Sequence, residues 1–161
     1  MLIQWKDNKR GMSIVEILIV IAVVIIGLTS LFGVAVFSLK LSILQKEAAR
    51  ANSLAREAIE AVRSLRDGTD WNIDGLGTLT AGIDYFPEAT TDSPPQWKLT
   101  PGQEIIDIFT RKIVFANVQR DTNDDIVEAG GSNDPDTKMV TATVSWKDQT
   151  LEIVTYLTNW Q

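Results

Sequence analysis

One carboxylate stands at the edge of the longest uncharged segment of the chain. Glu16 is followed by 23 residues, 17–39, none of which is charged, and Lys9 and Arg10 lie shortly before it. An acid carried to bilayer depth costs about 2.5–3.5 kcal/mol, so we expect Glu16 to have a specific role. The simplest role is a capping box, because residues 13–16 fit the S-x-x-E pattern in which the acid accepts a hydrogen bond from the capping residue's amide.

A second group of oxygen-bearing side chains lies in the last third of the chain. Asp121, Asn123 and Asp125 occupy alternate positions, which is the ligand spacing at the start of calcium loops. The turn glycine expected after the third ligand is replaced by Ile126. The pattern therefore predicts either a calcium site or an ordinary acidic turn between strands.

Two residue types that carry much of enzyme chemistry are missing. The chain has no cysteine and no histidine, so it offers no thiolate, no disulfide and none of the commonest general bases and transition-metal ligands. Paired acids such as Asp124 and Asp125 do not by themselves make a glycosidase, because nothing places them across a cleft. We predict that the protein is not an enzyme, and we expect no cofactor apart from the calcium considered above.

The uncharged segment belongs to a much longer helical pattern. Residues 17–39 exceed the roughly 20 helical residues that cross a hydrocarbon core. Residues 42–66 contain no proline or glycine and are rich in Ala, Leu, Glu, Arg and Lys, which are good helix formers. The sequence predicts one helix from about Ser13 to Arg66, about 80 Å long at 1.5 Å per residue. Its second half must therefore leave the membrane.

That second half is amphipathic and basic, whereas the rest of the chain is acidic. Apolar residues recur at helical spacing along one face and predict a stripe that must be buried: Leu54, Ala58, Ile59, Ala61, Val62 and Leu65. Residues 40–66 carry six Lys or Arg and three Glu, while residues 67–161 carry six against 16 acids, a net charge of −10. The acidic residues 67–161, here called the head, repel phosphate backbones, so we expect no nucleic-acid partner. A local basic spot at Arg111, Lys112 and Arg120 is the exception.

The acidic part predicts a small sheet. Residues 71–103 are dense in Gly, Pro, Thr and Asp and predict loops with one short strand near 82–86. Three segments predict strands: 105–119, 138–146 and 151–158. The last two are separated by a short reversal at 147–149 and predict an antiparallel hairpin. The fold class expected is α+β, a long N-terminal helix packed against a small antiparallel sheet.

The tryptophans allow two interpretations. Trp71, Trp97, Trp146 and Trp160 could form a sugar-binding surface. Trp146 lies on the apolar side of its expected strand, so for this residue we favour a place in the core. The sequence does not decide between the two for the other three.

The amino-terminal pattern resembles the type IV pilin and pseudopilin superfamily. The residues that carry the resemblance are a basic leader ending in Gly11, then Met12, then Glu16 four residues later, then the apolar segment and its amphipathic extension. It covers about residues 9–67, and the head only in its general plan. It implies cleavage by a prepilin peptidase between Gly11 and Met12, methylation of the new amino group of Met12, and pairing of Glu16 with the amino terminus of a neighbouring subunit. Lys9 and Arg10 would hold the cleavage site among anionic headgroups.

The resemblance implies a structural subunit precursor, a minor pilin or pseudopilin of a type IV pilus-like or type II secretion filament. Its parts would be a leader (1–11), a transmembrane helix (12–39), an amphipathic extension (40–66) and an extracytoplasmic head (67–161). The expected partners are prepilin peptidase, other pilin or pseudopilin subunits and the membrane. The precursor would cross the cytoplasmic membrane once with its head outside, and the mature subunit would enter an extracellular or periplasmic filament.

Three other interpretations stay open. A secretory signal could be cut near Gly33-Val34-Ala35, although its apolar segment would exceed the usual 7–15 residues. A plain single-pass anchor could carry an external domain. The head could also be a binding module, at a filament tip or on the membrane, that serves adhesion or substrate recognition.

Overall fold

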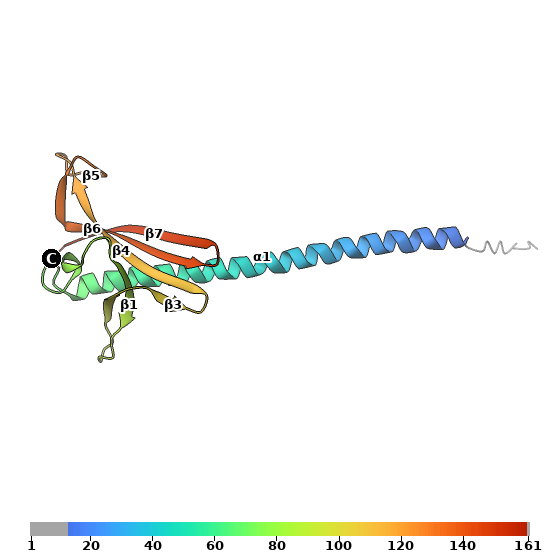
Figure 1. Cartoon of the computed structure of the whole chain (residues 1–161), viewed down its shortest axis with the longest axis horizontal. Coiled ribbons are helices and arrows are strands. Elements are labelled where there is room, and N and C mark those ends of the chain that lie inside the picture. The colour runs from blue at the N-terminus through green and yellow to red at the C-terminus, as the bar shows by residue number, and fades with distance from the viewer. Residues whose placement is uncertain (1–12, 161) are drawn as a thin grey trace, which may run out of the picture. The chain divides into compact units, whose positions relative to one another are not determined.

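The computed structural model describes residues 13–160 and confirms the α+β fold. One helix, α1 (Ile14–Gly68), is followed by a 3-10 turn, η1 (Leu76–Thr78), and by a seven-stranded antiparallel sheet (Figure 1). The chain divides into two compact units between Lys46 and Glu47. The first half of α1 is therefore described separately from the second half and the sheet.

Helix α1 has nearly the predicted bounds, because 55 residues without a proline offer it no interruption. Its end is fixed locally. The Thr69 hydroxyl donates to the carbonyl oxygen of Leu65 at 2.6 Å, so one of the carbonyls left free at the helix terminus is satisfied.

The strands are β1 (Asp84–Ala89), β2 (Trp97–Pro101), β3 (Glu104–Ile106), β4 (Phe109–Arg120), β5 (Ile126–Val127), β6 (Ser132–Trp146) and β7 (Gln149–Thr158). Their order across the sheet is β2-β1-β4-β6-β7, with β3 and β5 also paired to β4. The register between β4 and β6 shifts between Asn117 and Val118 of β4, because residues 135–137 of β6 have no partner in β4. Beyond this shift, β5 and the adjoining ends of β4 and β6 form an arm that projects from the rest of the sheet (Figure 1).

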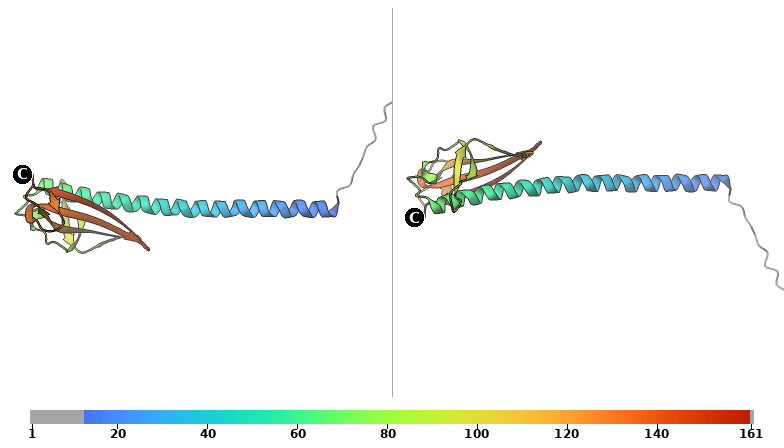
Figure 2. Two further views of the ribbon diagram at one scale, coloured as in Figure 1. Left: turned by 90° about the horizontal axis from the view of Figure 1, so that it is seen from above. Right: turned by 90° about the horizontal axis from the view of Figure 1, so that it is seen from below.

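The second half of α1 packs on one face of this sheet (Figure 2). The predicted apolar stripe is confirmed, since Leu54, Ala58, Ile59, Ala61 and Val62 are all buried and Leu65 packs against them. Alanines dominate the contact and let the helix approach the strands closely. Opposite them lie buried side chains of β4 and β6: Ile113, Phe115, Val140, Ala142 and Val144.

Two tryptophans complete the core. Trp146 is buried, as predicted, and lies 5.8 Å from Phe109 between ring centroids. Trp71 is also buried and donates from Nε1 to the carbonyl oxygen of Pro135 at 3.1 Å. Gly77 approaches Trp71 so closely that a Cβ there would lie 2.6 Å from the Trp71 carbonyl oxygen. Any larger residue at position 77 would displace this ring.

The strand predictions were wrong in several places, since β5 was not predicted and β6 begins at Ser132, six residues before the predicted strand 138–146. Residues 105–119 are not one strand, because the chain turns at Asp107, whose φ of 55° closes a β3–β4 hairpin. Residues 97–101 were expected to be loop but form β2, and the short strand expected near 82–86 is β1 at 84–89. The reversal at 147–149 is confirmed as a two-residue turn, with φ of 50° at Lys147.

Candidate assembly helix and polar centres of the head

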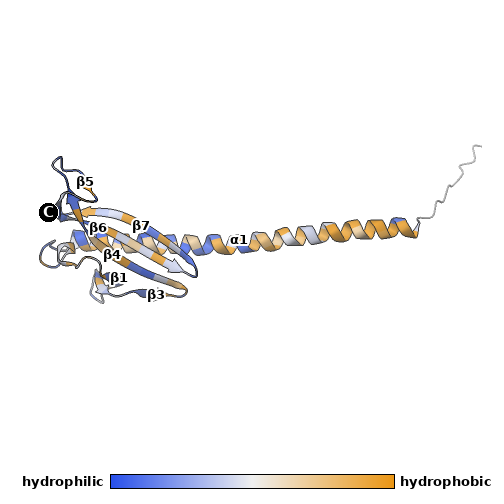
Figure 3. Ribbon diagram, turned by 45° about the horizontal axis from the view of Figure 1, so that its top comes forward, coloured by the Kyte–Doolittle hydropathy of each residue, from blue (hydrophilic) through white to orange (hydrophobic). Residues whose placement is uncertain are grey.

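The first half of α1 exposes apolar side chains all around its circumference. From Ile14 to Leu44 its large hydrophobic residues are between 37% and 76% exposed. None of the residues in its most apolar stretch of 18 is buried. Figure 3 shows the same segment coloured as hydrophobic along its length. A helix that is apolar on every side is stable only in lipid or among other apolar helices. By length and composition this one can span a membrane.

Two hydroxyl groups in this segment, those of Thr29 and Ser30, are satisfied by the helix itself. Thr29 donates to the carbonyl oxygens of Ile25 and Ile26, both at 3.0 Å, and Ser30 donates to that of Ile26 at 2.8 Å. Such bonds remove the cost of carrying a hydroxyl into an apolar environment. Glu16 is the one charged residue of the segment 14–39.

Glu16 lies in the first turn of α1 and is exposed. The amide of Ile17 donates to the Ser13 carbonyl oxygen at 3.2 Å, so the helical bonding begins at Ser13. A carboxylate in this turn is favoured by the helix dipole. The other residues predicted for this site, Lys9, Arg10, Gly11 and Met12, lie outside the described residues, so their roles stay predictions.

Within the head, Arg111 forms a buried ionic centre that the sequence did not reveal. Its side chain is 3% exposed, and its guanidinium contacts carboxylates of two different elements. Nε donates to Glu104 of β3 at 3.0 Å, while Nη1 donates to Glu57 of α1 at 3.1 Å and to the Leu54 carbonyl oxygen at 3.2 Å. Arg111 therefore ties the helix to the β3–β4 hairpin.

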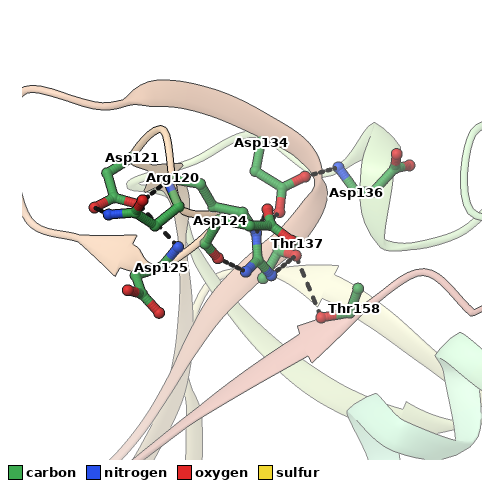
Figure 4. A network of polar contacts seen from close by, with 9 residues as sticks. Arg120, Asp121, Asp124, Asp125, Asp134, Asp136, Thr137 and Thr158 are labelled. Atoms are coloured by element: carbon green, nitrogen blue, oxygen red, sulfur yellow. Dashed lines mark hydrogen bonds and ion pairs between the residues drawn. The ribbon is translucent and has the colours of Figure 1, made fainter.

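A second centre joins the projecting arm to the sheet (Figure 4). Arg120 donates from Nε to Asp134 at 2.7 Å and from Nη1 to the Asp124 carbonyl oxygen at 2.7 Å. Its Nη2 donates to Thr137, whose hydroxyl is 3.2 Å from that of Thr158. These bonds connect β4, the 121–125 loop, β6 and β7.

The three residues of the predicted basic spot therefore do not form a free cationic surface. Arg111 is enclosed by Glu57 and Glu104, Lys112 pairs with Asp84 at 3.1 Å, and Arg120 pairs with Asp134. Their charges are paired with carboxylates and link the elements of the fold to one another. The useful sequence signal was the position of Arg111 among Phe109, Ile113 and Phe115, on the apolar side of the strand.

Two of these carboxylates give the head a defined acid sensitivity. The hydrogen bond from Arg120 is the main cause that lowers the pKa of Asp134, and hydrogen bonds from Gln103 and then Lys112 lower the pKa of Asp84. Because both folded-state pKa values lie below the unfolded value of about 3.9, the stabilisation is present above that pH and is lost as the pH falls below it.

We therefore expect the melting temperature of the head to be nearly constant from about pH 5 to 7 and to fall below about pH 4. Asp134→Asn should lower the melting temperature at pH 7, and its deficit relative to the wild type should shrink as the pH falls to about 3. Circular dichroism melts of both proteins across this range measure the effect. A deficit that stays constant with pH would show that ionisation of Asp134 is not involved.

The predicted calcium ligands lie in one loop, but the Asp121 carboxylate is occupied by hydrogen bonds from within that loop. Asp121 Oδ1 accepts from the amides of Asn123 and Asp125, at 2.8 and 3.0 Å, and Oδ2 accepts from Asn123 Nδ2 at 3.4 Å. Over residues 13–160 no group of three or more Asp, Glu, His or Cys residues is arranged to hold a metal ion. Arg120 already supplies positive charge to this loop. Calcium binding stays a hypothesis.

From this geometry we expect melting temperatures in millimolar calcium and in chelator to agree within about 1 °C. A ligand present at 100 times its Kd would add about 2.7 kcal/mol, which corresponds to more than about 10 °C for a domain of this size. Differential scanning calorimetry in the two buffers distinguishes the cases. A rise of several degrees that Asp121→Asn abolishes would establish the site.

The architecture is type IV pilin-like: a long apolar N-terminal helix whose second half packs on an antiparallel sheet. None of the family models, curated proteins or solved structures compared with the chain matches it.

Proposed function

We propose that the protein is the precursor of a minor pilin or pseudopilin, a structural subunit of a type IV pilus-like or type II secretion filament. The observation that carries the proposal is the two-part nature of α1, which is exposed and apolar in one half and buried on the sheet in the other. The exposed half supports anchoring in a bilayer and packing among helices of other subunits. The buried half supports a head that stays folded in both settings.

In this proposal Glu16 fixes the axial register of each subunit in the filament. When the helices leave lipid and pack together, a carboxylate without a cation becomes an uncompensated buried charge. The amino group created by cleavage between Gly11 and Met12 supplies that cation in a neighbouring subunit. The pairing selects the correct axial position of a subunit more than it adds net stability.

The partners in this proposal are a prepilin peptidase, which cuts the leader, a methylating activity that modifies Met12, and other pilin or pseudopilin subunits. The subunit is a substrate of this chemistry and catalyses none itself. The precursor crosses the cytoplasmic membrane once with its acidic head outside. Basic residues flank the apolar segment on both sides, Lys9 and Arg10 before it and Lys40 and Lys46 after it, so the proposed orientation rests on the resemblance.

Mass spectrometry of the membrane-associated protein tests the proposal at its base. We expect a mature chain that begins at Met12 with a methyl group on its amino nitrogen. Gly11→Ala should leave uncleaved precursor, because the added methyl group crowds the peptide bond that the peptidase must reach. A mature chain that begins elsewhere would refute the proposal.

A further inference from the structure

The sheet ends on one side in a long strand whose outer edge is unpaired. Strand β7 has ten residues and, among the strands of residues 13–160, pairs only with β6 (Figure 1). Its sequence is TLEIVTYLT after Gln149, rich in the β-branched and aromatic residues that favour strands. Val154 and Tyr156 are 52% and 48% exposed on it. An edge of this kind is a template for another strand.

The opposite edge of the sheet is protected, whereas β7 is not. Strand β2 has only five residues, ends in Pro101, and carries Lys98, which pairs with Glu88. Short length, proline and lysine are the usual protections of an edge strand. Strand β7 contains no proline and no lysine, and Glu152 is its single charged residue. The contrast indicates that the β7 edge is kept free for a partner.

A groove lies beside this edge. It has a volume of about 460 Å³ and is lined by Ile153 of β7 and by Arg56, Ile59, Glu60 and Arg63 of α1. Because β7 is the last strand on its side, the groove between it and the helix opens at the free edge of the sheet. A strand added there would direct alternate side chains toward Ile59 and Ile153.

The net charge of the groove indicates the charge of the partner segment. Two arginines and one glutamate line it. Arg63 pairs with Glu60, so its charge is matched. Arg56 has a neutral partner, with Nε donating to Asn52 at 3.2 Å. The groove is thus positive, although residues 67–161 have a net charge of −10.

We propose that an extended acidic segment of a partner protein adds as a strand to the free edge of β7. Its main chain bonds to β7, an apolar side chain enters the groove between Ile59 and Ile153, and a carboxylate meets Arg56. Main-chain pairing supplies affinity in this mode of recognition, and the groove supplies specificity. The proposal concerns the sheet and the second half of α1, and it does not depend on assembly through the first half of that helix.

A designed peptide tests the proposal on the full chain in detergent micelles. The probe has about ten residues, matched to β7, alternates valine with threonine, and carries a central glutamate and a fluorescein label. We expect saturable binding by fluorescence anisotropy and slower amide exchange in β7 but not in β2. Arg56→Glu should weaken binding at least about tenfold through charge repulsion.

Arg50→Glu is the matched control, since Arg50 is an exposed arginine of α1 that does not line the groove. It should change the affinity less than about twofold. Equal losses in the two variants, unchanged exchange in β7, or equal binding of a peptide with lysine in place of glutamate would overturn the proposal. Self-association of the purified chain through β7, detected by sedimentation and by protection of β7 without peptide, would overturn it too, because the occupant would then be a second copy.

Discussion

Glu16→Val should reduce incorporation of the subunit into filaments at least about tenfold. The substitution makes α1 more apolar, so anchoring in the membrane should be unaffected. In the proposed filament it leaves the amino group of a neighbouring subunit without its carboxylate among packed apolar helices. Removing one partner of a buried ion pair costs about 3–5 kcal/mol, and each 1.4 kcal/mol is about a factor of ten in an equilibrium. Sheared filaments and the membrane fraction are compared by immunoblot.

The matched control for this experiment lies at the other end of the uncharged segment. Lys40→Met removes a charge there and should leave incorporation within about twofold of the wild type, because Lys40 has no proposed partner in the packed helices. Leader cleavage must be normal in both variants, so that a defect reports on assembly. Normal incorporation of Glu16→Val would remove the pairing from the mechanism.

The long helix could be predicted from sequence because its determinants are local. The absence of proline, the helix-forming composition after residue 40 and the uncharged segment 17–39 all act within a few turns. The apolar stripe of residues 54–65 also follows from periodicity alone: five of its six predicted residues are buried, and Leu65 packs against the core. The periodicity therefore predicts which face of the helix packs on the sheet.

The sheet was harder to predict because its boundaries depend on single backbone conformations and distant pairs. Residues 105–119 are rich in β-branched and aromatic residues, as one strand would be, and the positive φ of Asp107 that divides them leaves only a weak signal in sequence. Strand β2 exists because it pairs with β1, from Tyr85 with Pro101 to Ala89 with Trp97. A segment dense in loop-forming residues was thus made a strand by a tertiary contact.

The candidate sites also differ in whether their determinants are local in sequence or depend on tertiary contacts. Glu16 stands out in sequence because an acid beside an apolar segment is locally anomalous. Arg111 is also anomalous, on the apolar side of its strand, but its partners Glu57 and Glu104 come from other elements and cannot be identified from the sequence around it. In the acidic loop the alternating oxygens predict ligands for a metal, and the structure adds that Asp121 accepts hydrogen bonds from its own loop, so the calcium site stays a prediction.

Neutralising both carboxylates around Arg111 should destabilise the head by about 3–5 kcal/mol. The reason is the unequal burial of the three groups. Glu57 and Glu104 are 47% and 31% exposed and can be hydrated, but the Arg111 side chain is 3% exposed and cannot. The Glu57→Gln, Glu104→Gln variant therefore leaves an uncompensated buried cation. Urea unfolding of the full chain in detergent, followed by tryptophan fluorescence, measures the free energy of unfolding.

The unequal burial of Arg111 and its two partners also predicts that a third substitution restores stability. Adding Arg111→Met to the doubly neutralised variant should recover more than half of the lost stability, because a buried ionic group replaced by an apolar one of similar length is often neutral or stabilising. The exposed pair of Glu60 with Arg63 provides the control, since Glu60→Gln should cost less than about 1 kcal/mol. If Arg111→Met instead destabilises the variant further, Arg111 acts by filling space and bonding the Leu54 carbonyl, and its charge is secondary.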